Sequence, residues 1–450
     1  MDQLPLELLQ RILTNLDLTA LRNAALSCRT FFAAFKSTEV LITSEIFLRQ
    51  INYDVLPEAI LVNKSWSLGP PSVNKGIAFA ENLKHREPAP AKWSLADALP
   101  LAQFHEKVSY LASQAAHEAL TKQPRLLAMG EPPTPTYEEM CRFERALYRF
   151  QLYCNVVGRL FPLAEKELLD IFFEWFATWE NEQLACIHEH LVRVVSKQLV
   201  AAFNYLVEHD VNWGYMRVPY IEGHWSEYAQ GNLAGGIERI YYLSRALDYT
   251  QRHALLSNGE DRWDEPHGVV GFLSYGLEKG ANPLVPPLIE LSEMDEDDKE
   301  LVCGKPFYED PDPGPASMWE WVYRNQEPGD LVANPGMLNQ RRWAFPFWDF
   351  SRLQAVGLLG NPEIPGPRSP TDPELEEYGT PERLALLKES RRERTKIRES
   401  GGTGFYSPQD LSKVKWESND KIDNEKRRLV LPHSLEEAKG FLRDYNKDVV

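Results

Sequence analysis

The chain has 450 residues, of which 43% are hydrophobic and 11% aromatic, and its net charge is −17. This composition is typical of a folded protein of two or three domains with a sizeable core. No run of apolar residues is long enough to span a membrane, and the first residues lack the basic-then-apolar order of a secretory signal. We therefore expect no membrane partner and a cytoplasmic or nuclear location, or both.

The charge and the cysteines exclude further classes of protein. Residues 65–370 carry about −15 of the net charge, which repels phosphate backbones and makes nucleic acid an improbable partner. The five cysteines are an odd number and form no C-x-x-C pair, so we expect neither a disulfide framework nor a structural zinc site.

The first predicted elements are three short helices within residues 4–35. Pro5 suits a first helical turn, and it is followed by apolar residues at helical spacing: Leu8, Leu9, Ile12, Leu13 and Leu16. Asp17 should end this helix, and Thr19 can cap a second one carrying Leu21 and Leu26. Ser27 can cap a third helix, with Phe31, Phe32 and Phe35 on it.

A segment of this length cannot bury so many apolar side chains by itself. Chains this short seldom fold without a staple or a partner. Some of the side chains must therefore be covered by another domain of the chain or by another protein.

The order of residues in this segment closely resembles the F-box, over roughly residues 2–45. The pattern L-P-x-E-L-L-x-x-I-L-x-x-L-D-x-x-x-L is matched by Leu4, Pro5, Glu7, Leu8, Leu9, Ile12, Leu13, Leu16, Asp17 and Leu21. Phe31 stands where the family usually has Trp, and Ser27 where it usually has a branched apolar residue. The aromatic, loop-rich remainder looks like the helical C-terminal regions of fungal F-box proteins.

The resemblance implies a division of labour. In F-box proteins the three helices dock on a small Skp-type adaptor, held by a cullin scaffold with a RING subunit, while the rest of the chain holds a protein substrate. The anchors implied for the adaptor are Leu4, Pro5, Leu8, Ile12, Leu16, Leu21 and Phe31. The competing interpretation is that this segment packs on the downstream body as an ordinary core element.

The rest of the chain is predicted to be helical, which makes the whole protein all-α. Thr136 and Glu139 form a capping box that opens a long amphipathic helix, and a second helical region covers 164–209. Shorter helices are expected at 237–256, 316–325, 374–400 and 434–446. We predict four parts: the F-box at 1–45, a connecting helix and Pro/Gly-rich linker at 46–92, an irregular, loop-rich helical interaction domain at 93–370, and a charged helical tail at 371–450.

The stretches that resemble catalytic or metal-binding motifs lack the residues or the spacing that those motifs need. His188 and His190 are two residues apart on a predicted helix, whereas zinc-binding helices use a spacing of four. The glycines of GNLAGG do not make a nucleotide-binding loop, and MDEDD lacks the turn glycine of a calcium loop. We predict no catalytic residues, no metal and no cofactor.

Two aromatic stretches are the best candidates for a substrate surface, although dense aromatics are more often core. They contain Trp319 and Trp321, and then Arg341, Arg342, Trp343 and Trp348. Arginine beside exposed aromatics is typical of interface hot spots.

The sequence thus favours a non-enzymatic substrate receptor of an SCF-type cullin-RING ubiquitin ligase, with an unknown protein substrate. Two alternatives stay open. One is a scaffold that binds the adaptor outside any ligase, and the other is an enzyme with an unrecognised site in 93–370.

Overall fold

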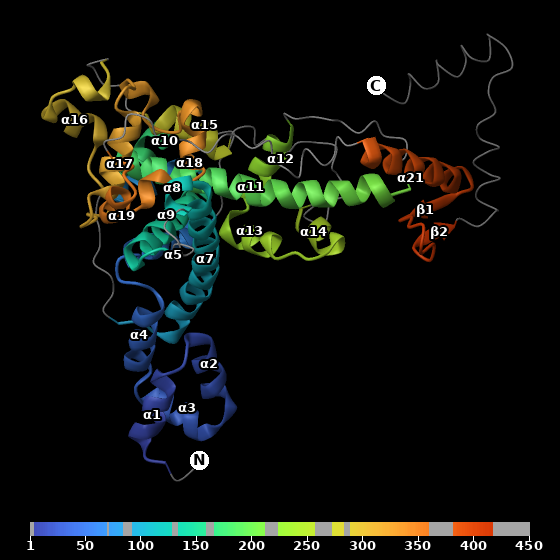
Figure 1. Cartoon of the computed structure of the whole chain (residues 1–450). Coiled ribbons are helices and arrows are strands. Elements are labelled where there is room, and N and C mark those ends of the chain that lie inside the picture. Colours follow the sequence, from blue (N-terminus) through green and yellow to red (C-terminus); the bar gives the residue numbers. More distant parts are fainter. Residues whose placement is uncertain are drawn as a thin grey trace. The chain divides into compact units, whose positions relative to one another are not determined.

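The computed structural model describes residues 4–69, 72–83, 92–127, 134–158, 166–211, 224–256, 272–282, 289–359 and 381–416. These residues are mostly helical, and the prediction of an all-α fold is confirmed (Figure 1). Among them the strands are the short β1 (Gly402–Gly404) and β2 (Val414–Trp416), paired antiparallel. No helix in these ranges is long and apolar enough to cross a membrane.

The first four helices are α1 (Leu6–Thr14), α2 (Leu18–Ser27), α3 (Arg29–Ser37) and α4 (Glu39–Gln50). Their caps differ from the predicted ones by one or two residues. Asp17 itself caps α2 by accepting a hydrogen bond from the Ala20 N–H (2.6 Å), and Cys28 takes the capping position of α3. The extended backbone at Asp17 and Cys28 leaves their side chains free to turn back onto the first helical turn.

One long helix, α7 (Leu95–Lys122), packs both on the N-terminal helices and on the helical body. It comes after α5 (Leu56–Ser65), the 3-10 turn η1 (Trp66–Leu68) and α6 (Val73–Asn82), and it is followed by α8 (Pro124–Leu127). α2 and α4 both pack on α7, and the rings of Phe47 and Trp93 lie 4.3 Å apart. The N-terminal helices and the body therefore share one hydrophobic core.

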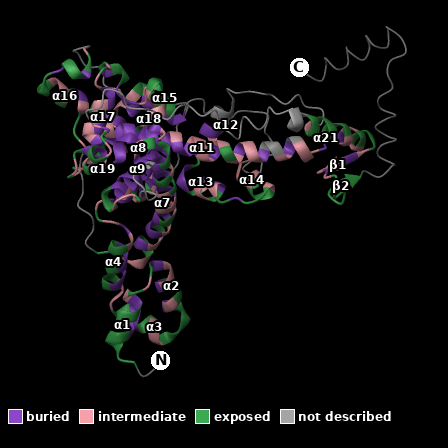
Figure 2. Ribbon diagram, in the orientation of Figure 1, coloured by how far each residue is buried: buried purple, intermediate pink, exposed green. Residues whose placement is uncertain are grey.

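The centre of the body is α9 (Tyr137–Val156), which is buried along most of its length (Figure 2). The predicted capping box is present: Thr136 accepts from the Glu139 N–H, and the Glu139 carboxylate accepts from the Thr136 N–H. α5 and α7 pack against α9. The predicted second helical region is divided into α10 (Lys166–Glu174) and α11 (Thr178–His209).

Shorter elements complete the body. They are α12 (His224–Leu233), α13 (Gly236–Ser244), α14 (Tyr249–Leu256), α15 (Phe272–Gly280), η4 (Leu291–Glu293), α16 (Glu296–Cys303), α17 (Gly314–Tyr323), η5 (Pro328–Asp330), η6 (Pro335–Met337), α18 (Leu338–Arg341), η7 (Phe345–Phe347) and α19 (Phe350–Ala355). The helix expected at 237–256 is thus two helices, and the one at 316–325 is α17.

Contacts divide the chain into two compact units. The first contains residues 1–199 and 221–370, and the second contains 200–220 and 371–450. In the second unit α21 (Pro381–Glu399) and the β1–β2 hairpin pack on the end of α11. The predicted boundaries 1–45, 46–92, 93–370 and 371–450 stay a prediction, and the helix expected at 434–446 lies outside the described residues.

Candidate partner-binding surface

The N-terminal helices bury one apolar face of each helix. Leu9 and Leu13 of α1, Leu21 of α2 and Phe35 of α3 are each 5% exposed or less. α1 packs on α3 and α4, while α2 packs on α3 and α7. These contacts explain why the core-facing apolar residues of the segment are buried.

A second apolar face of α1 is exposed. Leu4, Leu8 and Ile12 are 41%, 48% and 44% exposed, and Pro5 is also on the surface. Residues four apart lie on the same side of a helix, so Leu8 and Ile12 form a row that continues toward Leu4. We call Leu4, Pro5, Leu8 and Ile12 the α1 row.

The α1 row exists because apolar residues occur as adjacent pairs in the sequence. Neighbouring helical residues point about 100° apart, so only one member of each pair can face the core fully. Leu9 is buried and Leu8 exposed, and Leu13 is buried and Ile12 exposed. In α3 the pair Phe31–Phe32 behaves the same way: Phe31 packs against the core and Phe32 is 50% exposed.

The structure places the remaining predicted anchors differently. Leu16 and Phe31 are half-buried against the core, and Leu21 is fully buried. Leu21 packs inward because α2 is enclosed by α3 and α7, so its side chain is not available to a partner. Leu26, which is 70% exposed, and Phe32 were not among the predicted anchors, although the apolar pair Phe31–Phe32 was a signal for the second.

Residues 1–41 match the F-box-like family. This segment is an F-box-like domain. No curated protein and no solved structure matches the chain. The domain indicates a role in docking to a Skp-type adaptor of SCF ligases, and the proteins that carry it are generally non-enzymatic adaptors.

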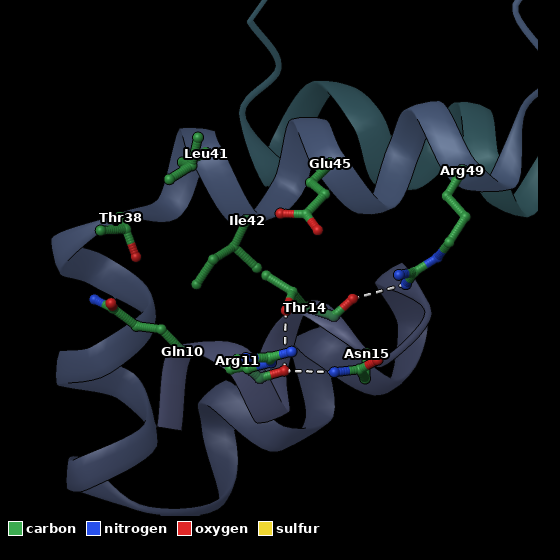
Figure 3. A pocket seen from close by; sticks show the side chains of 9 residues that line it. All are labelled: Gln10, Arg11, Thr14, Asn15, Thr38, Leu41, Ile42, Glu45 and Arg49. Atoms are coloured by element: carbon green, nitrogen blue, oxygen red, sulfur yellow. Dashed lines mark hydrogen bonds between the residues drawn. The ribbon is translucent and has the colours of Figure 1, made fainter. Parts of the chain in front are cut away.

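The other side of α1 in the F-box-like domain borders a polar pocket of about 450 Å³. Figure 3 shows its nine side chains, from α1 and the residue after it on one wall and from Thr38 and α4 on the other. Arg49 closes one end by donating to the carbonyl oxygens of Thr14 (2.7 Å) and Leu16 (2.9 Å). On the helical wheel Gln10 and Thr14, which line this pocket, lie roughly opposite Leu8 and Ile12. The apolar row and the polar pocket are therefore separate surfaces.

The aromatic stretches do not form a surface. Trp319, Trp343 and Trp348 are at most 1% exposed, and Arg341 is buried with its Nη1 3.5 Å from the Glu182 Oε1. Each of the three indole N–H groups donates to an internal oxygen, which removes the main cost of burying a tryptophan. Trp321 and Arg342 are half-buried. The predicted substrate surface is corrected accordingly: of its six residues Trp319, Arg341, Trp343 and Trp348 belong to the core.

The histidines of α11 point to different partners, as their spacing predicts. His188 Nε2 lies 3.0 Å from the Gln230 Oε1, and His190 Nδ1 lies 3.1 Å from the Glu118 Oε2. Within the described ranges no three His, Cys, Asp or Glu side chains are arranged to hold a metal ion. Burial raises the pKa of the Cys186 thiol well above its usual value, which suits a packing role rather than a nucleophile.

Proposed function

We propose that this protein is the substrate-recognition subunit of an SCF-type cullin-RING ubiquitin ligase. Its F-box-like domain docks on a Skp-type adaptor, and the remainder of the chain holds a protein substrate. The observation that supports the proposal is the α1 row, because it presents large apolar side chains to water in a domain whose own core is already filled.

The row fits recognition of a helix by an apolar groove. Such interfaces use anchors at intervals of three, four and seven residues, as Leu8 and Ile12 are placed. An interface of ordinary size buries roughly 1,600 Å² in total. A central anchor in it contributes about 2 kcal/mol or more on truncation to alanine.

In this function the protein acts by position rather than by chemistry. Holding a substrate beside the ligase replaces a bimolecular encounter by an intramolecular one and raises the effective concentration of the substrate. No residue of the chain then takes part in bond formation. We place this activity in the cytoplasm, the nucleus or both, which a fluorescent fusion of the full chain would test.

The test is capture of the adaptor with a triple variant, Leu4→Ala, Pro5→Ala and Ile12→Ala. We expect loss of co-purified adaptor with an unchanged far-UV circular dichroism spectrum, because the three side chains lie outside the core. The matched control replaces Leu247, Leu301 and Leu386, which are 85%, 59% and 62% exposed elsewhere in the chain, by alanine. Undiminished adaptor binding by the first variant would overturn the proposal.

The same capture separates a ligase subunit from a scaffold. A cullin recovered together with the adaptor supports the ligase, and its recovery should also be lost in the triple variant. Adaptor recovered in full without any cullin contradicts the ligase and supports a scaffold that uses the same docking surface.

A further inference from the structure

The helix α21 has one face fixed against the end of α11. Ser390 donates from Oγ to the Glu208 carbonyl oxygen (2.5 Å), and Arg394 donates from Nη1 to the Asp210 carbonyl oxygen (2.8 Å). Arg394 is only 2% exposed. These contacts determine which residues of α21 face outward.

The outward face carries a stripe of four cations and one threonine. Lys388, Arg391, Arg392, Thr395 and Lys396 follow one another at steps of three, one, three and one, which places them on one side of the helix. They line a shallow depression of about 410 Å³. Lys388, Arg392 and Lys396 are exposed, as Figure 2 shows for much of α21. We call these five residues the basic stripe.

Three cations of the basic stripe, Lys388, Arg392 and Lys396, are weakly paired or not paired with carboxylates among the described residues. Lys396 pairs with Glu393 at 2.6 Å, but both side chains are largely exposed, and such surface pairs are weak. Lys388 and Arg392 form no ion pair within the ranges that the structure describes. Residues 385–416 contain eight cations and four acids, in a chain whose net charge is −17.

Like charges at intervals of three and four residues destabilise a helix by mutual repulsion. An anionic ligand lying along the stripe would remove this repulsion and gain several charge-assisted contacts at once. From Lys388 to Lys396 the stripe rises by eight steps of 1.5 Å, or about 12 Å. That length corresponds to roughly four residues of an extended peptide, whereas a single phosphate would reach only part of it.

We propose that the basic stripe binds a segment of the protein substrate that is rich in Asp and Glu. That this segment belongs to a substrate rests on the proposed function, whereas the binding of an acidic segment does not. An acidic segment of about four residues has the charge opposite to that of the stripe and a similar length. Recognition of acidic motifs by clustered cations is an established mode of peptide binding.

The test uses the purified full chain and a fluorescein-labelled peptide of six glutamates, with a six-glutamine peptide of the same length for comparison. We expect fluorescence anisotropy to show saturable binding of the glutamate peptide alone, weaker at 300 mM than at 50 mM salt because the contacts are exposed. Replacing Lys388, Arg392 and Lys396 by glutamine should raise the Kd at least about tenfold.

The matched control makes the same change in charge away from the stripe, at Lys166, Lys279 and Lys305, which are exposed residues of the first compact unit. The first two are exposed lysines with surface carboxylate partners, like Lys396. The control should stay within about twofold of the wild type. Equal weakening by both triple variants would show a non-specific charge effect and overturn the proposal.

A third peptide separates an acidic-segment site from a phosphate site. Tight binding of a peptide whose one charged side chain is a phosphoserine, without binding of the glutamate peptide, would contradict the proposal in favour of a phosphate site. Because the assay contains no adaptor, its failure leaves the proposed docking role intact. Failure of adaptor capture likewise leaves the peptide result standing as a property of α21.

Discussion

Three buried arginines, Arg142, Arg145 and Arg149, lie on one side of α9 and show how buried charge is accommodated in this core. Arg142, for example, donates from Nε to Asp310 (2.7 Å) and from Nη1 to Asp349 (2.7 Å), and Arg149 donates to Glu180 (2.6 Å). Burial opposes the ionisation of Asp310, but the Arg142 guanidinium outweighs it and holds the pKa of that carboxyl below its usual value. Since an unpaired buried charge costs several kcal/mol, the Arg142 pairs hold α9 against Asp310 and Asp349, which lie more than 100 residues later in the chain.

Another buried group at the residue scale predicts how stability depends on pH. His105 of α7 is 6% exposed, and its Nδ1 lies 3.1 Å from the Tyr148 hydroxyl; Ser109 and Glu144 lie on its other side. Burial lowers the pKa of His105 from 6.5 to about 4. Below pH 6.5 the unfolded chain binds a proton that the folded chain refuses, so stability is lost as the pH falls through this window.

We therefore expect the free energy of unfolding to fall less between pH 7 and pH 5 in His105→Gln than in the wild type. The difference should be about 2 kcal/mol, of the roughly 3 kcal/mol available over the whole window. Urea unfolding at the two pH values measures it. The exposed His117→Gln is the control and should keep the wild-type fall; an identical fall in His105→Gln would contradict the assignment.

At the scale of the element, α1 carries its core residues and the proposed partner-binding residues on different sides of one helix. Its Leu9 and Leu13 face the core, while Leu8 and Ile12 of the α1 row face solvent. A helix that is apolar on two sides has one more apolar face than its own domain uses. The second face is the element-level reason for proposing a partner.

Of two neighbouring substitutions in α1, one should therefore lower stability and the other should weaken adaptor binding. Leu13→Ala leaves a cavity and should lower the free energy of unfolding by about 2–5 kcal/mol. Ile12→Ala removes an exposed side chain and should change it by less than about 0.5 kcal/mol, while weakening adaptor binding. Chemical unfolding and a titration with adaptor measure the two effects; equal destabilisation by both variants would contradict the orientation of α1.

At the scale of the whole molecule, the F-box-like domain belongs to the same compact unit as the helical body. Residues 1–199 and 221–370 form that unit, and α2 and α4 pack directly on α7. The domain is thus a part of the body's core as well as the proposed docking module. Its two roles are compatible because they use different faces of its helices.

This shared core predicts the outcome of deleting residues 1–45. The deletion cuts α4 and uncovers the side of α7 on which α2 packs, so the truncated protein should melt more than about 4 °C below the full chain. The variant Leu4→Ala, Pro5→Ala and Ile12→Ala should melt with the wild type. Differential scanning fluorimetry compares the three proteins. A truncation that melts at the wild-type temperature would show that the body does not depend on these helices.

Local features of the sequence were enough to predict much of this protein. The all-α class, the Thr136–Glu139 capping box and the three N-terminal helices follow from caps and apolar spacing, which act over a few residues. The residue pattern of the first helices resembled the F-box, and the family match to residues 1–41 confirms that resemblance. The adjacent apolar pairs showed that this segment has more apolar surface than one core-facing stripe can bury.

Only the tertiary structure decided which side of each helix is covered. Leu21 turned inward because α7, some eighty residues later, lies against α2. Trp319 and Trp348 became core because distant segments cover them: the Trp319 ring lies 6.4 Å from the Trp179 ring, and the Trp348 ring lies 5.6 Å from the Phe143 ring. Burial depends on contacts between distant segments, and those contacts are absent from any short window of sequence.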